Sequence, residues 1–212
     1  MATQVQKFLK LLSEKLECTQ VIDNTILIFP TSAIARGVRL ERTSQKNVYY
    51  IWRFVFPLYC PLIKVIPLTY SKRFSLDGEG DTVIAIDGDL NVLAEMISRK
   101  LKGHFDYREI LARVDVEDFF QICRPSREFL SPVRALTLSM SDYIVGEVAR
   151  ARQLLLNLIA QEKPFFYLEE AKELASRMVI WFDSDRSAMD LYIELCKQKN
   201  IELFFSGLIM EE

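Results

Sequence analysis

The chain has 212 residues, of which 50% are hydrophobic and 11% aromatic, so it can bury a well-filled core and is unlike disordered proteins in composition. With only 7 glycines and 7 prolines, dense regular structure is expected rather than long loops. No stretch approaches the ~20 apolar residues that span a bilayer, and the N-terminal residues lack the apolar region of a signal peptide. These features predict a cytoplasmic protein without a membrane segment.

The first part of the chain is predicted to form one helix followed by an antiparallel sheet. Residues 3–17 carry Phe8, Leu9 and Leu12 at helical spacing, which is typical of an amphipathic helix with one buried stripe. Alternating or β-branched runs with short connections then predict a meander of about four to five strands. These strands are expected at residues 25–29, 37–43, 47–56, 68–76 and 82–86.

The strand at residues 47–56 has the clearest pattern. Tyr50, Trp52, Phe54 and Phe56 alternate with Tyr49, Ile51, Arg53 and Val55, which predicts a central strand covered on both sides, at least in part. The aromatic side chains could stack nucleic-acid bases, but this spacing is more typical of a core. Arg53 interrupts the apolar pattern, so its guanidinium is expected to be desolvated and paired, with Asp87 or Asp89 as candidate partners.

From residue 89 onward the pattern becomes helical, with start signals at several helices. Asp89, Asp115, Ser131 and Asp185 are candidate N-caps. The helices are expected at 90–101, 107–114, 116–123, 131–161 (disturbed near Gly146), 168–182 and 186–199. The apolar tail 201–205 fits either a strand or a docked terminus. The predicted fold is α+β, one compact unit over 1–212, with a helix and sheet in 1–88 and a helical layer in 89–212.

Charge is distributed unevenly along the chain. Residues 1–75 contain 11 Lys and Arg against 4 Asp and Glu, and residues 76–212 contain 16 against 25. A basic sheet could bind an anionic partner such as nucleic acid, a phosphorylated ligand or an acidic protein. Alternatively, the acidic helices neutralise the sheet internally or bind a basic partner themselves; internal pairing is favoured because the pI is near 5.7. The candidate anion- or partner-binding residues are Arg39, Arg42, Arg53 and Arg73.

Few residues suit catalysis or metal binding. The single histidine, His104, lies at an expected helix C-terminus, where it caps carbonyls more often than it catalyses. The four cysteines are far apart without a CxxC pair, which indicates buried apolar thiols rather than a zinc site. No phosphate-binding or dinucleotide-binding glycine motif occurs. We therefore expect no catalytic residue, no cofactor and no metal site, with carboxylate-only magnesium binding as the alternative.

Residues 49–74 resemble an uncharacterised group of bacterial proteins of similar length. The similarity consists of an aromatic strand, a Pro-Leu-Tyr-x-Pro turn at residues 57–61, and a strand that ends with Arg73 and an apolar residue. That group commonly has a glycine before the arginine, where this chain has Ser71-Lys72. The resemblance implies no catalytic residues, and it implies an interaction role because similar proteins often accompany bacterial toxins or defence systems.

The predicted function is a non-enzymatic protein-interaction module of bacterial type, with an immunity, antitoxin-like or defence-associated role and a protein partner. One alternative is an enzyme that uses carboxylates and arginines on a phosphate-containing substrate, which needs a cleft joining Arg53 and Arg73 to carboxylates. The other is nucleic-acid binding through the basic sheet, which predicts salt-dependent retention of DNA or RNA.

Overall fold

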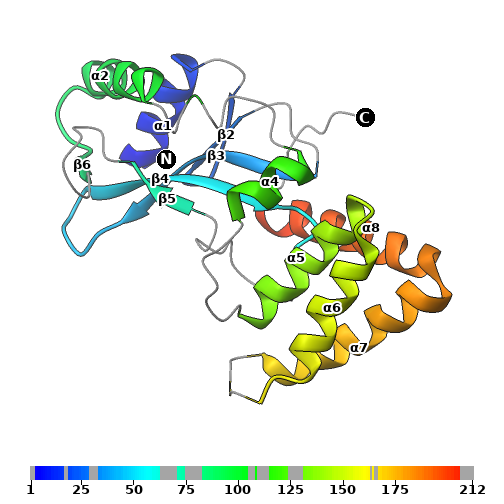
Figure 1. Cartoon of the computed structure of the whole chain (residues 1–212). Coiled ribbons are helices and arrows are strands. Elements are labelled where there is room, and N and C mark those ends of the chain that lie inside the picture. Colours follow the sequence, from blue (N-terminus) through cyan, green and yellow to red (C-terminus); the bar gives the residue numbers. More distant parts are fainter. Residues whose placement is uncertain are drawn as a thin grey trace. The chain divides into compact units, whose positions relative to one another are not determined.

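The computed structural model describes residues 3–16, 19–28, 33–62, 71–74, 83–104, 108, 115–123, 131–162, 164 and 167–205 (Figure 1). The chain divides into two compact units. Unit 1 comprises Met1–Phe56, Leu68–Val114 and Gly207–Glu212, and unit 2 comprises Pro57–Pro67 and Asp115–Ser206. Helices and an antiparallel sheet confirm the α+β class, while one compact unit over the whole chain stays a prediction.

Unit 1 contains a six-stranded sheet in which every described strand pairing is antiparallel. The order is β1-β2-β3-β4-β5, and β6 also pairs with β4. The strands are β1 Thr19–Ile22, β2 Thr25–Ile28, β3 Ile34–Arg42, β4 Val48–Pro57, β5 Ser71–Arg73 and β6 Val83–Ala85.

All five predicted strands are present within the described residues, and two details differ from a simple meander. The short strand β1 was not predicted, and it pairs with β2 so that Thr19 faces Ile28. The last strand, β6, pairs with the first half of β4, where Val48 faces Ala85, instead of following β5. The predicted strand residues 29, 68–70, 75–76 and 82 lie outside the described part of the chain.

Two helices of unit 1 pack against each other, α1 Gln4–Glu14 and α2 Leu90–Gly103. A capping box begins α1, because Gln6 N donates to Thr3 Oγ1 at 3.3 Å and Thr3 N donates to Gln6 Oε1 at 3.1 Å. Asp89 begins α2 as predicted, accepting hydrogen bonds from the backbone N–H groups of Asn91 and Val92. The predicted stripe of α1 is buried and lies beside β1 and β2.

Unit 2 is helical, and successive helices from α5 to α8 pack against each other. Its described helices are α4 Val116–Cys123, α5 Pro132–Ile144, α6 Val148–Ile159, α7 Leu168–Ser184 and α8 Arg186–Phe204. The predicted caps Asp115, Ser131 and Asp185 each accept a hydrogen bond from the backbone N–H three residues later. None of the helices described in either unit is long and apolar enough to cross a membrane.

The disturbance predicted near Gly146 is confirmed. The segment 131–161 forms two helices, α5 and α6, because Gly146 adopts a φ of 87° that continues no right-handed helix. The predicted end of the last helix was wrong. The tail 201–205 is neither a strand nor a separate docked segment, since α8 continues to Phe204 and Phe205 caps it with its side chain fully buried. Of the helix predicted at 107–114, all but Arg108 lies outside the described residues.

Residues that follow β4 are anchored in unit 2 by buried polar contacts. The Asn200 side chain of α8 donates to the backbone carbonyls of Leu58, at 2.6 Å, and Cys60, at 2.8 Å. The Tyr59 hydroxyl lies 2.8 Å from the Ser141 hydroxyl of α5. These bonds satisfy polar groups of a turn that would otherwise be costly to bury.

Candidate functional site

The four predicted arginines do not gather at one place. Arg53 of β4 faces Lys72 of β5, and Trp52 faces Arg73. Because successive side chains of a strand point to opposite faces, Arg73 shares a face with Trp52 and Arg53 lies on the other face. Arg39 of β3 is partly exposed and faces Thr25, whereas Arg42 ends the strand and is exposed.

Arg73 belongs to a compact group of side chains on one sheet face, hereafter the sheet-face cluster, which consists of Glu41, Tyr50, Trp52 and Arg73. The Arg73 guanidinium lies over two rings, with its Cζ 3.8 Å from the centroid of Tyr50 and 4.7 Å from that of Trp52. The Trp52 indole N–H donates to Glu41 Oε2 at 2.7 Å. All four side chains are partly exposed, so the cluster is both held in place and accessible.

The geometry of the cluster follows from strand pairing. Tyr50 and Trp52 are two residues apart and therefore lie on the same face of β4. Arg73 of β5 lies opposite Trp52. Val83 of β6 lies opposite Tyr50 and is 45% exposed. Arg39 is two residues from Glu41 on β3, so it lies on the same face as the cluster. Two of the predicted arginines, Arg39 and Arg73, therefore lie on the same sheet face as Tyr50 and Trp52.

The coverage of β4 changes along the strand. Phe54 and Phe56 are buried, which confirms a core role for the second half of the predicted aromatic face. Tyr50 and Trp52, on the same face, keep part of their exposure. On the opposite face, Ile51 is buried close to Phe74, whose ring meets that of His104 at the end of α2 edge-on, at 5.2 Å. Helix α2 therefore covers that opposite face at this point, and the cluster lies on the other one.

Arg53 is partly exposed as a whole, although its Nε atom is buried, as expected for a guanidinium within this strand. Of its two proposed partners, Asp89 caps α2, and pairing with Asp87 stays a prediction. Arg36 of β3, which was not singled out from the sequence, is buried more deeply, with 1% exposure. It shares a face with Val38, whose partner Ile26 is fully buried. An available signal was the alternation Ile34, Arg36, Val38, Leu40, which places Arg36 on an apolar face.

Charge is nearly balanced inside each unit. Unit 1 contains 15 Lys and Arg against 14 Asp and Glu, and unit 2 contains 12 against 15. The strong division seen along the sequence does not follow the units, because acidic residues between 76 and 114 belong to the same unit as the basic strands. Unit 1, which contains the sheet, is therefore not uniformly basic.

The other candidate groups are structural where they are described. His104 is the C-cap of α2, as predicted, and its backbone N–H donates to Leu101 O. Cys60 and Cys196 are buried free thiols, which agrees with the predicted apolar role. Cys18 and the Cys123 side chain lie outside what is described. Among the described residues, no three His, Cys, Asp or Glu side chains converge as metal ligands would.

The fold and the cluster define an α+β protein with an aromatic–arginine surface. No protein-family model, no curated protein and no solved structure matches the chain. The resemblance of residues 49–74 to a bacterial protein group therefore stays a prediction.

Proposed function

We propose that the protein is a non-enzymatic interaction module that binds a partner protein through the sheet-face cluster. The observation that carries this proposal is the stacking of Arg73 on Tyr50 and Trp52, with all three side chains partly exposed. Trp, Tyr and Arg are the residue types enriched at the energetic centres of protein interfaces. Side chains that are already held in one conformation lose less entropy when a partner binds.

The surroundings of the cluster suit a protein partner. Val83 adds an exposed apolar side chain beside Tyr50. Arg39 and Glu41 add charges of both signs on the same face. An apolar and aromatic centre with a mixed polar rim is the usual composition of a protein interface. The Glu41 carboxylate also orients the Trp52 indole through its hydrogen bond.

The alternatives receive less support. Nucleic-acid binders carry an uncompensated basic surface, whereas unit 1 has nearly equal numbers of both charges and the cluster itself contains Glu41. Base stacking needs accessible ring faces, and Arg73 occupies one face of both rings. A phosphate-processing site would need Arg53 and Arg73 together, and strand pairing sends them to opposite faces. The narrower immunity or antitoxin-like role stays a prediction.

The test is co-purification from native cell extract at low and high salt, with the full-length chain as bait and mass spectrometry as readout. We expect one stoichiometric protein that R73A reduces strongly, because truncating an interface centre costs about 2 kcal/mol, or roughly 30-fold in affinity. R42A is the matched control, since it removes an exposed arginine outside the cluster.

A second pair of variants tests the contribution of the Trp52 indole apart from that of the Arg73 charge. W52A removes a ring of the cluster, and W181A removes the other tryptophan of the chain, which lies in α7 of unit 2. The proposal expects loss of the partner with W52A and retention with W181A, provided that circular dichroism shows both variants folded. Retention of nucleic acid without a protein partner, or equal loss with R73A and R42A, would refute it.

A further inference from the structure

Strand β1, Thr19–Ile22, forms one edge of the sheet in unit 1, at the opposite end of the strand order from β5. Its four residues are all partly exposed, whereas the four residues of its neighbour β2 are all buried. In the described part of the chain, β2 is the single strand that pairs with β1. Among the described residues, the outer side of β1 is therefore open to a further strand.

The backbone of β2 bonds to its two neighbouring strands in alternation, as in any antiparallel sheet. Leu40 N of β3 donates to Asn24 O at 2.9 Å, just before β2 begins. Two residues further along, the backbone groups of Ile26 therefore also point toward β3, with which it pairs. The backbone groups of Thr25 and Leu27 point to the other side, toward β1.

This register decides which backbone groups of β1 point away from the sheet. Gln20 and Ile22 bond to β2, because they face the two residues of β2 that point toward β1. The N–H and C=O groups of Thr19 and Val21 alternate with them and point outward. On that side, neither residue has a backbone hydrogen-bond partner within the described ranges. Each of the two therefore offers one donor and one acceptor to a further strand.

The sequence of β1 lacks the features that keep edge strands from pairing with other chains. Charged side chains, proline and a very short strand are the usual protections. The four residues of β1, Thr-Gln-Val-Ile, include neither a charge nor a proline. At the other end of the strand order, β5 is three residues long and contains Lys72 and Arg73, and β6 is also three residues long. Protection is thus present in β5 and β6 and missing in β1.

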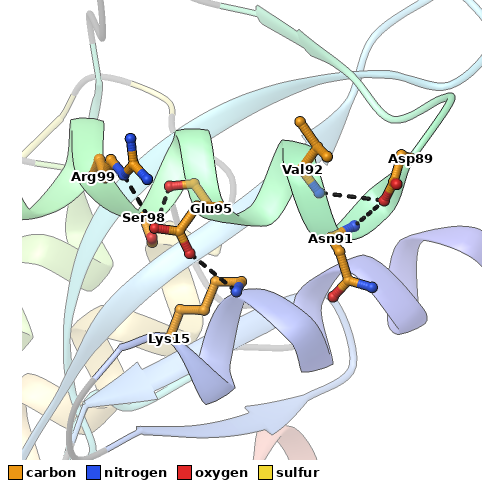
Figure 2. A network of polar contacts seen from close by, with 7 residues as sticks. All are labelled: Lys15, Asp89, Asn91, Val92, Glu95, Ser98 and Arg99. Carbon is orange, nitrogen blue, oxygen red and sulfur yellow. Dashed lines mark hydrogen bonds and ion pairs between the residues drawn. The ribbon is translucent and has the colours of Figure 1, made fainter.

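Polar contacts with α1 and α2 hold the open edge in one conformation. Thr19 Oγ1 lies 2.7 Å from Ser13 Oγ and donates to Ser13 O at 3.1 Å, which joins the start of β1 to α1. At the end of α1, Lys15 Nζ lies 3.1 Å from Glu95 Oε2 of α2, as Figure 2 shows. A strand that is already ordered loses less conformational entropy when another strand pairs with it.

We propose that β1 pairs antiparallel with β1 of a second copy of the chain, across a two-fold axis at Gln20. In this register, Thr19 of each copy faces Val21 of the other, and each facing pair forms two backbone hydrogen bonds. A strand without charge meets its own copy without repulsion, which favours a second copy as the occupant. The sheet-face cluster lies on β3, β4 and β5, so this inference is independent of the proposed function.

Sedimentation equilibrium of the full-length chain tests the self-association. We expect the mass to rise from 24.7 kDa toward twice that value between about 1 and about 300 μM, because small interfaces are weak. V21P removes the outward N–H and no bond to β2, so it should weaken the dimer at least about tenfold. V21A is the matched control, because it keeps that N–H, and W52A should leave the dimer unchanged.

Two results of this experiment would overturn the proposal. A mass that stays at that of the monomer would exclude a second copy and leave a strand of another protein as the occupant. Equal weakening by V21P and V21A, with both variants shown by circular dichroism to be folded, would place the contact elsewhere.

Disulfide trapping with Q20C tests the register without a proline. Residues that face each other in a non-hydrogen-bonded pair have Cα atoms about 4.5 Å apart, which suits a disulfide. Diamide is the oxidant: the two thiols lose two protons and two electrons as the S–S bond forms, and diamide takes these up to become a hydrazine. We expect a covalent dimer of Q20C that dithiothreitol reverses. The controls are K46C, at an exposed position, and the unmodified chain with its four cysteines. A Q20C dimer no more abundant than in these controls would contradict the proposed axis.

Discussion

At the scale of single residues, the ion pair of Asp142 and Arg150 joins a buried anion to a cation that is largely solvated. The Asp142 side chain in α5 is fully buried, while 42% of the Arg150 side chain is exposed. Arg150 Nε donates to Asp142 Oδ1 at 2.9 Å, and Oδ2 has no hydrogen-bond partner among the described residues. Burial raises the pKa of Asp142, and the bond to Arg150 opposes that rise only in part.

This asymmetry predicts unequal effects of removing either partner. R150M leaves a buried carboxylate without its cation, which should lower the stability of unit 2 by about 3 kcal/mol near neutral pH. D142N leaves an arginine that water can solvate, so it should lower the free energy of unfolding of unit 2 by less than about 1 kcal/mol. Urea titration followed by Trp181 fluorescence in a W52F background measures unit 2 alone.

The pH dependence provides a further check on this pair. Because the pKa of Asp142 is raised in the folded state, its stabilising effect is present at acidic pH and is lost as pH rises through that raised pKa. The cost of R150M should therefore be smaller at about pH 5 than at about pH 7. A cost that does not change with pH would show that the carboxylate remains adequately solvated.

Cys60 provides a residue-scale prediction at alkaline pH. Burial raises the pKa of this thiol to about 12, although its contact with the Thr137 hydroxyl, 3.0 Å from Sγ, acts in the opposite direction. The buried, protonated Cys60 thiol contributes its full stabilisation below about pH 8.5, the pKa of a cysteine thiol in the unfolded chain. This stabilisation is lost as the pH rises toward 12.

We therefore expect Cys60 to resist alkylation in the native protein near pH 8, and C60S to reduce the loss of stability in the alkaline range. Peptide mapping by mass spectrometry after iodoacetamide treatment reads the first result, and urea titration reads the second. Rapid native labelling of Cys60 would contradict the buried contacts that anchor the turn after β4.

At the scale of elements, the close approach of β2 and β3 depends on Gly37. A Cβ atom at Gly37 would lie 2.0 Å from the backbone oxygen of Ile26. The strands would have to separate, because a backbone oxygen cannot move aside as a flexible side chain can. A glycine inside an alternating strand can mark such a close approach of another backbone, but the sequence does not show which segment approaches Gly37.

G37A should destabilise unit 1 by about 3 kcal/mol because it overpacks the β2–β3 pair. G88A is the matched control: Gly88 has a φ of 64°, but a Cβ added there would meet no atom within 4 Å, so only backbone strain of about 1 kcal/mol is expected. Trp52 fluorescence in a W181F background reports unit 1. Equal costs for the two variants would refute the proposed contact.

Local patterns predicted the elements well where one residue determines a helix start or a strand face. Asp89, Asp115, Ser131 and Asp185 each cap the helix that they were expected to begin. Contacts between distant segments were not predictable in this way. The pairing of β6 with β4 depends on which segments meet in the folded sheet.

The same distinction applies to the candidate site. Arg73 and the aromatic face of β4 were visible in the sequence, but the two were assigned to separate roles. Their combination requires the register that places Arg73 opposite Trp52. Partial exposure of Tyr50 and Trp52 could not be read from alternation, because Phe54 and Phe56 follow the same pattern and are buried.

At the scale of the whole molecule, the sheet-face cluster belongs to unit 1, where it lies on the strands. Unit 2 contributes buried networks that hold the turn 57–62. The near balance of charge in each unit means that recognition would rest on particular side chains rather than on net charge.

The central claim, protein binding through the sheet-face cluster, is tested most directly by photo-crosslinking from position 83 in living cells. Val83 faces Tyr50 and is 45% exposed, so a benzoylphenylalanine there adjoins the cluster. We predict a covalent adduct with one protein that R73A abolishes and R42A preserves. An adduct with nucleic acid, an adduct unaffected by R73A, or no adduct with any macromolecule would contradict the account.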